Sequence, residues 1–345
     1  MTAVALNIIL DKPDRTYQSS ETIKGQVKVL VEREFSAAGL LLALYSKGFS
    51  EWKRNTATFF GERTERKLFK GRWEPGEYTY PFEFVTPPGP FSYKGHVFDV
   101  TWHLGAKVQT SAEKNVTAEA EITVVPEKKA PQETGTKHSG EAVYRESPRN
   151  LKGFFGFSLV LLLVGIVVGW RNSPFAEGTE TGIFFFGGVI PTVLGLALVF
   201  FTTWQALVNR RIKKVEVRLG TRQARPGDRI PCSVTFEAHL PFEVERVSAV
   251  LRGEEIVDFR KGKNSKFRKH LLHESRQELS LEIKQVPANV PVQARGEVPV
   301  PAGIPYSIDL MESDEGMALT WQIEFIIGMK KWPDWMHLEK ITVLP

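Results

Sequence analysis

Cysteine is almost missing from this chain, because Cys232 is the single one among 345 residues. One thiol excludes an intramolecular disulfide framework, and this agrees with a reducing compartment. Cys232 follows Pro231 in an apolar alternation, so we expect it to be a core residue. A leader is also missing, since the apolar stretch Val4–Leu10 runs directly into Asp11. We therefore expect no cleavable signal peptide.

Motifs that carry catalysis are missing as well. The sequence has no glycine-rich phosphate loop, no Gly-x-Ser-x-Gly elbow and no paired-histidine metalloprotease signature. His270 and His273 lie close together beside Glu274, but that spacing gathers metal ligands on a helix, and this segment is predicted to be a hairpin followed by a strand. We expect no catalytic residue, no cofactor and no metal ion, and the chain is predicted not to be an enzyme.

Charge is absent from two long apolar runs in the middle of the chain, residues 154–170 and 183–208. As α-helices they would reach about 25 and 39 Å, against about 30 Å for the hydrocarbon core of a bilayer. The runs predict two transmembrane helices, at 151–170 and 183–208, joined by an extracytoplasmic loop at 171–182. Glycines in both runs would let these helices pack closely.

Basic residues flank these runs unevenly. Arg171 is the one basic residue in the connecting loop. The basic residues outside the pair of runs are Arg145, Arg149, Lys152, Arg210, Arg211, Lys213 and Lys214. The positive-inside rule then predicts an integral membrane protein with two spans and with both termini in the cytoplasm.

The remaining parts, 1–125 and 213–345, show the alternation of apolar and polar residues that is typical of β-strands. Clusters of proline and glycine separate the alternating stretches, and no long stretch in either part has a helical period. We expect an all-β fold of two antiparallel β-sandwiches separated by the two-helix transmembrane hairpin. Residues 126–150 are polar and without periodicity, which predicts a flexible linker.

The second part repeats the first, because similar residues recur at a constant offset of 207 positions. The matched pairs are Glu21 with Asp228, Ile23 with Ile230, Val27 with Val234, Phe35 with Phe242, and Leu44 with Leu251. Further along, Pro90-Phe91-Ser92 corresponds to Pro305-Tyr306-Ser307, and Trp102 corresponds to Trp321. The chain is therefore predicted to be a tandem of two related domains.

Turn and core residues follow one another in a characteristic order in the first part. They are Tyr17, Glu21, Ile23 and Gly25, then Gly-Glu-Tyr-Thr-Tyr-Pro-Phe-Glu-Phe at 76–84, then Pro87, Pro-Phe-Ser-Tyr-Lys-Gly at 90–95, and Trp102. In this order they resemble the N-terminal domain of the arrestin family, and 213–345 resembles the family more loosely. The resemblance implies arrestin-like β-sandwiches in tandem. Ser19-Ser20 departs from the Pro-Gly of that family, which Pro226-Gly227 supplies in the second copy.

Basic residues gather in two segments of a chain whose net charge is +5. Beside a cytoplasmic leaflet such residues would meet anionic lipid headgroups, and the alternative is that they form solvated hairpin faces. The residues expected to contact anionic lipid or a protein partner are Lys53, Arg54, Arg260, Lys261, Lys263, Lys266, Arg268 and Lys269. Aromatic residues interleave with the first segment, but strand alternation accounts for them, and nucleic-acid binding is not expected.

These observations favour a membrane-anchored, arrestin-like scaffold or adaptor that binds an unknown protein partner at the cytoplasmic face through loops or sheet edges. The alternative is an accessory subunit of a membrane transport or secretion complex, whose glycine-lined spans would pack against a larger channel. Copurification with a multi-span partner would distinguish the two hypotheses.

Overall fold

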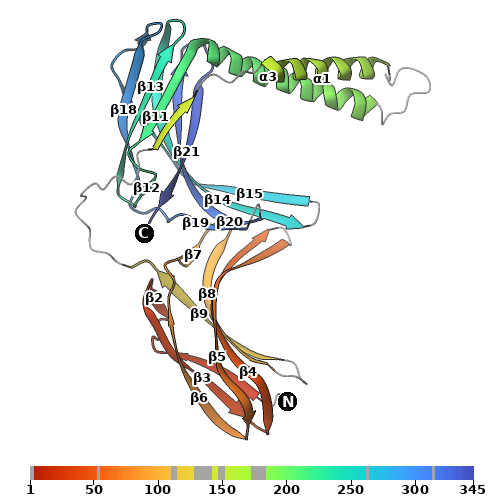
Figure 1. Ribbon diagram of the computed structural model, residues 1–345, viewed down its shortest axis with the longest axis vertical. Helices are drawn as coiled ribbons and strands as arrows, with labels where there is room; N and C mark the ends of the chain where they lie inside the picture. The colour runs from red at the N-terminus through yellow and green to blue at the C-terminus, as the bar shows by residue number, and fades with distance from the viewer. Residues whose placement is uncertain are drawn as a thin grey trace.

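The computed structural model of the full chain describes residues 4–52, 55–109, 115–127, 142–146, 152–171, 184–261, 264–312 and 315–345. Strands dominate these residues and form two β-sandwiches, one on each side of a pair of helices in the sequence (Figure 1). The predicted all-β class is confirmed.

The first sandwich comprises a three-stranded sheet and a six-stranded sheet. The smaller has the order β1 (Val4–Leu10), β3 (Thr22–Val31) and β6 (Gly76–Val85). The larger has the order β2 (Thr16–Gln18), β9 (Val116–Val125), β8 (Asp99–Gln109), β4 (Phe35–Trp52) and β5 (Asn55–Trp73), and β7 (Tyr93–Lys94) pairs with β8. Because alternate side chains of each strand point inward, the apolar residues of both sheets meet in one core.

The second sandwich comprises a five-stranded sheet and a seven-stranded sheet. The smaller has the order β10 (Ala142–Glu146), β11 (Ile212–Leu219), β13 (Arg229–Ala238), β18 (Pro291–Pro299) and β16 (Ser280–Leu281). The larger has the order β12 (Gln223–Ala224), β21 (Trp335–Val343), β20 (Glu315–Met329), β14 (Phe242–Lys261) and β15 (Asn264–Glu278). In addition, β17 (Gln285–Val286) pairs with β14, and β19 (Ile308–Glu312) pairs with β20.

The two sandwiches make the same hydrogen bonds at the positions that the sequence matches. Trp102 Nε1 donates to the Pro90 carbonyl at 2.7 Å, and Trp321 Nε1 donates to the Pro305 carbonyl at 3.1 Å. Both tryptophans are 1 % exposed. The strand pairing also recurs, since the short strand β2 runs parallel to β9 and the short strand β12 runs parallel to β21. Equivalent residues therefore have equivalent environments in the two halves.

The turn that departs from the Pro-Gly pattern keeps the conformation of its counterpart. Ser20 has a positive φ of 64°, and the matched Gly227 has a φ of 97°. The turn bonds are also matched, because Ser20 N–H donates to the Thr86 carbonyl at 3.1 Å and Gly227 N–H donates to the Val300 carbonyl at 2.8 Å. Glycine adopts positive φ without a steric penalty, whereas serine does not. The first sandwich therefore holds this turn at a conformational cost that the second avoids.

The chain between the sandwiches forms α1 (Lys152–Arg171), a π-helical segment η1 (Phe184–Val189) and α3 (Ile190–Arg211). Within the described residues, neither helix combines the length and the apolar character that crossing a membrane requires. The predicted 183–208 helix is not one regular α-helix, because Phe184–Val189 is π-helical and α3 begins at Ile190 and continues into the polar sequence Asn-Arg-Arg at 209–211. Charged residues also stand at both ends of α1. The predicted transmembrane hairpin at 151–170 and 183–208 is therefore wrong.

Other expectations depended on that hairpin. The localisation as a two-span integral membrane protein with cytoplasmic termini is wrong, since the helices needed for it are not long and apolar enough within the residues described. Most of the predicted connecting loop at 171–182 lies outside the described residues. The close packing of the helices is confirmed, because a Cβ added at Gly165 or Gly195 would overlap the facing residues Thr192 and Leu162.

The predicted linker 126–150 contains a strand. β10 pairs antiparallel with β11, from Ala142 opposite Leu219 to Glu146 opposite Val215. This pairing adds a fifth strand to the smaller sheet of the second sandwich. The segment was predicted to be flexible because it has no core pattern of its own. An edge strand, however, gains its ladder hydrogen bonds from the neighbouring strand.

Candidate functional site

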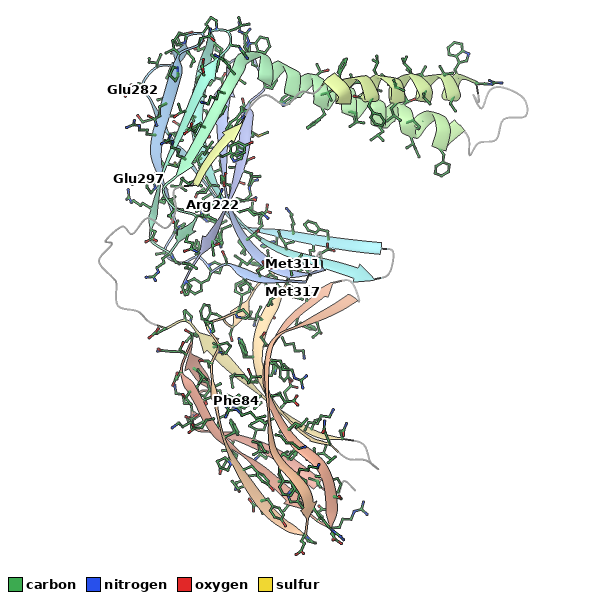
Figure 2. The ribbon with its side chains drawn as sticks, in the orientation of Figure 1. Phe84, Arg222, Glu282, Glu297, Met311 and Met317 are labelled. Atoms are coloured by element: carbon green, nitrogen blue, oxygen red, sulfur yellow. The ribbon has the colours of Figure 1, made fainter. Side chains whose placement is uncertain are left out.

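A loop of the first sandwich contributes to the core of the second. Val97, Phe98 and Val100 are 4 %, 2 % and 1 % exposed, and they belong to the buried cluster of the second sandwich. Tyr93 packs against the same cluster. Figure 2 labels Met311 and Met317 on the side of the second sandwich that lies toward the first. Burial of apolar surface therefore holds the two sandwiches together.

Glu255 of β14 lies fully buried at this junction, with 0 % exposure. Its carboxylate accepts hydrogen bonds from three residues of the first sandwich. The His96 N–H lies 3.0 Å from both oxygens, the Val97 N–H donates at 2.9 Å, and the Tyr93 hydroxyl donates to Oε1. Hydrogen bonds to a charged acceptor are stronger than neutral ones, and a buried carboxylate needs such donors. We call this arrangement the Glu255 lock.

Burial raises the pKa of Tyr93 well above its ordinary value, and its hydrogen bond to Glu255 raises it further. The phenol is therefore a stable donor at neutral pH. Gly95 lets the loop come this close, because a Cβ there would overlap Glu255 Oε1 and the Phe98 carbonyl. The Gly95 N–H donates to Asp99 Oδ1 at 3.0 Å, which holds the turn between β7 and β8. Any larger residue at this position would push the loop away from the lock.

Two ring contacts flank the lock. Phe91 and Tyr306 meet edge to face with centroids 5.7 Å apart, and they are the middle residues of the two matched Pro-x-Ser motifs. His96 and His270 lie with centroids 4.2 Å apart. His270 is the cross-strand neighbour of Glu255 in the β14–β15 ladder. Aromatic pairs add about 0.5 to 1.5 kcal/mol beyond burial, so these contacts reinforce the junction.

His270 and His273 lie in a strand, as predicted, but they share a face of it. A register shift between Gly253 and Glu254 places His270 opposite Glu255 and His273 opposite Gly253. Leu272 is the extra residue of the resulting bulge. It shifts the in-and-out alternation of the strand by one residue, so both histidines lie on the same side. Even so, among the residues described there is no group of three or more metal-ligating side chains that could hold an ion.

The predicted basic contact residues belong to two long hairpins, β4–β5 and β14–β15. Lys53, Arg54 and Lys263 lie outside the described residues, while Arg260 and Lys261 end β14. The others, Lys266, Arg268 and Lys269, lie in β15. Lys269 Nζ is 3.1 Å from Glu254 Oε2, so it already has an acidic partner. Lipid contact by these side chains stays a prediction. The transmembrane hairpin that motivated it is not found among the described residues.

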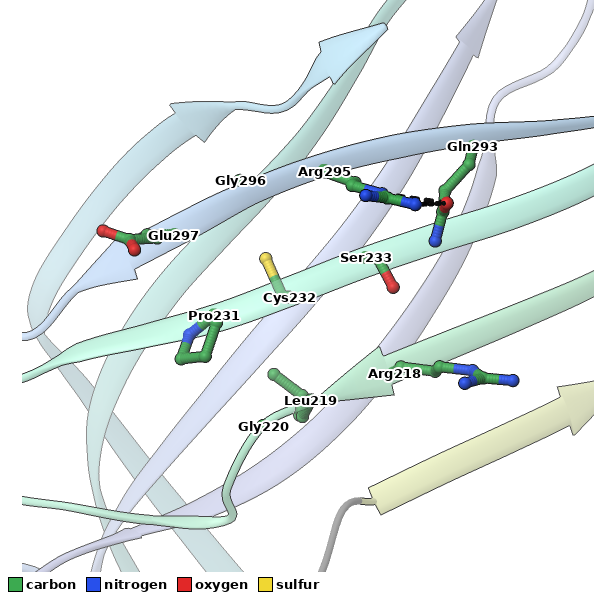
Figure 3. Close-up of a pocket in the computed structure, with 10 residues that line it drawn as sticks. All are labelled: Arg218, Leu219, Gly220, Pro231, Cys232, Ser233, Gln293, Arg295, Gly296 and Glu297. Carbon is green, nitrogen blue, oxygen red and sulfur yellow. Dashed lines mark hydrogen bonds between the residues drawn. The ribbon is translucent and has the colours of Figure 1, made fainter. Parts of the chain in front are cut away.

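A groove of about 680 Å³ lies on the smaller sheet of the second sandwich, over β11, β13 and β18 (Figure 3). Cys232 lies at its base, and Arg295 donates to Gln293 Oε1 at 2.6 Å at its side. The prediction that Cys232 is a core residue is confirmed, since it is 6 % exposed. Burial, with a smaller contribution from Glu297, raises its pKa to about 12. A thiol with so high a pKa is protonated at neutral pH and is a poor nucleophile.

We expect Cys232 to resist alkylation in the folded protein. A pKa near 12 in place of the ordinary 9.0 lowers the thiolate fraction about a thousandfold at pH 8, and burial restricts access further. Iodoacetamide should therefore label the denatured chain in minutes and leave the native chain unlabelled over the same time, as mass spectrometry would report. Equal labelling of both forms would contradict the buried, protonated thiol.

Comparison with protein-family models and with curated protein sequences finds no match to this chain. The arrestin-like resemblance therefore stays a prediction, resting on the turn and core residues quoted above.

Strand alternation in the sequence did not single out Glu255, the residue at the centre of the junction, although a signal for it is present. Ala249, Leu251 and Val257 of β14 are all 0 % exposed, and Glu255 shares their parity along the strand. A carboxylate at a core-facing position must find donors, because an unpaired buried charge is costly. Its donors lie far away in the sequence, so only the packing of the two sandwiches identifies them.

Proposed function

We propose that this chain is a two-domain binding scaffold, in which two β-sandwiches are held together as one unit and present a joint surface to a protein partner without catalysis. The Glu255 lock is the observation that carries the proposal. In it, a buried carboxylate of the second sandwich accepts hydrogen bonds from three residues of the first. Removing a charge from water is costly, and fixed hydrogen-bond partners are needed to offset that cost. The arrangement therefore favours one relative orientation of the domains.

A fixed orientation of the two sandwiches supports the binding of a partner to their joint surface. It has no direct bearing on a reaction in the groove over β11, β13 and β18. Cys232, the nucleophile nearest to that groove, is held protonated by burial. The hairpins β4–β5 and β14–β15, in contrast, extend from the two sandwiches with long outer strands (Figure 1). Exposed sheet edges are a common means of recognising another chain. The transport-subunit alternative depended on membrane spans and loses its basis with them.

We expect the two sandwiches to keep a single relative orientation in solution. Spin labels at Glu83→Cys and Glu297→Cys, introduced together in a Cys232→Ala background, report on exposed strands of the first and the second sandwich. Pulsed electron–electron resonance should give one narrow distance distribution. A broad distribution, as expected for two freely tethered domains, would contradict the proposed scaffold. A label pair within one sandwich, at Glu83→Cys and Lys107→Cys, gives the width expected of a rigid body.

A further inference from the structure

We infer that the outer edge of β15, from Asn264 to Leu271, binds an extended acidic segment of a partner protein, which adds to the sheet as a further strand. This inference rests on the proposed scaffold function and names the surface and the chemistry of its partner. Among the described strands, β15 pairs with β14 alone, so its other side is an edge of the larger sheet. Such an edge offers backbone N–H and C=O groups to another chain.

The edge is regular over this segment. The ladder with β14 runs without a register shift from Leu271 opposite Glu254 to Asn264 opposite Lys261. The bulge lies beyond it, toward the body of the sandwich. A regular ladder keeps the outer backbone groups in the repeating geometry that an incoming strand requires. The hairpin extends away from the body of the second sandwich (Figure 1).

Large apolar side chains are exposed along β15. Phe267 is 54 % exposed and Leu271 is 48 % exposed, and both lie on the face that carries Lys269. The other long edge, β5, differs in its backbone, because three register shifts interrupt its ladder with β4. Charged, distorted edges resist pairing with other chains. β5 is therefore a distorted edge, whereas β15 keeps a regular ladder from Asn264 to Leu271 and exposes Phe267 and Leu271 beside its basic residues.

Charge indicates what kind of strand would pair. The segment from Asn264 to Leu271 holds three basic residues, Lys266, Arg268 and Lys269, and no acidic one. Lys269 Nζ lies 5.4 Å from the centroid of the Phe267 ring, which places positive charge beside the apolar surface. An added strand would set its side chains beside those of β15 at cross-strand distance. Lys269 already pairs with Glu254, but the hairpin sequence from Glu254 to Leu271 holds six basic residues against three acidic ones. A strand of alternating apolar and acidic residues would contact Phe267 and Leu271 and offset this net positive charge.

The test uses the full chain and a fluorescent synthetic peptide of about twelve residues in which valine alternates with glutamate. Fluorescence anisotropy should show saturable binding that weakens as salt is raised, because screening reduces the charge term. The double variant Phe267→Ser, Leu271→Ser removes the apolar contacts without changing the charge, and it should weaken binding at least tenfold. The matched control is Leu30→Ser, which changes a 50 % exposed leucine on β3, a strand that is paired on both sides. This control should bind as the wild type does.

Two further measurements locate the contact. Amide hydrogen exchange on the wild type should slow at 264–271 when the peptide is added, and a peptide with lysine in place of glutamate should neither bind nor slow exchange. Absence of binding, equal binding of the lysine peptide, protection on β5 instead, or a dimer of the chain that the double variant dissociates would each overturn the inference. The spin-label distance between the sandwiches, measured on the double variant, shows whether the scaffold function fails as well or only the peptide-binding inference. A narrow distance with no peptide binding leaves the scaffold intact.

Discussion

Replacing Glu255 by alanine should uncouple the two sandwiches. The change leaves the Tyr93 hydroxyl and the N–H groups of His96 and Val97 without their acceptor in a buried site. Removing one partner of a buried charged arrangement costs about 3 to 5 kcal/mol, because the remaining groups are desolvated and unpaired. The label pair at Glu83 and Glu297 should change from a narrow to a broad distribution, and calorimetry should show two thermal transitions in place of one.

The adjacent Glu254→Ala variant is the control for that experiment. Glu254 pairs with Lys269 at 3.1 Å on the opposite side of the strand, where the lysine side chain is 49 % exposed. Exposed ion pairs contribute about 0 to 1 kcal/mol, so this variant should keep the narrow distribution. Tyr93→Phe removes one donor and should give an intermediate loss. A Glu255→Ala protein with an unchanged distance distribution would show that apolar burial alone holds the junction.

Replacing either of the two matched tryptophans of the repeat by alanine should destabilise its sandwich by about 3 to 5 kcal/mol, which is the usual cost of removing a buried tryptophan. Trp102 and Trp321 are each 1 % exposed, and each donates to a proline carbonyl of the matched motif. Because the two environments correspond, we expect Trp102→Ala and Trp321→Ala to have similar costs. Urea unfolding followed by hydrogen exchange in each sandwich measures them separately.

Trp170→Ala serves as the matched control, since Trp170 is 86 % exposed on α1. Its removal should change the free energy of unfolding by less than about 0.5 kcal/mol. Trp102→Phe and Trp321→Phe keep most of the buried ring area and lose the indole hydrogen bond, so each should cost about 1 kcal/mol or somewhat more. If one alanine replacement lowers the free energy of unfolding several times more than the other, the two halves are equivalent in structure but not in stability.

Strand positions and the repeat were determined by the sequence alone. The alternation at 229–238 predicts the whole of β13, because every second residue from Ile230 to Ala238 faces the core and the residues that alternate with them do not. The matched pairs Ile23 with Ile230 and Val27 with Val234 are 0 % exposed in both halves. A period of two residues is a local property, and a strand with one face on a core reveals it without knowledge of its partners.

The helix boundaries and the strand in the linker could not be predicted from the two-residue period, because they depend on contacts outside the local sequence. An uncharged run predicts an apolar segment, but it does not show that Phe184–Val189 turns as a π-helix ahead of α3. β10 has too little pattern to predict, because its hydrogen bonds come from β11. The shared face of His270 and His273 likewise depends on a bulge, which one extra residue in a ladder produces.

Only the tertiary structure decided where the two sandwiches meet. Glu255 lies in β14, and its donors lie in and after β7, so no local pattern connects them. The sequence marks Glu255 as a charge on the core-facing side of a strand, which requires some set of donors. Which donors satisfy it depends on the packing of Val97 and Phe98 into the second core. That packing is a long-range outcome of apolar burial, whereas strand alternation is a local one.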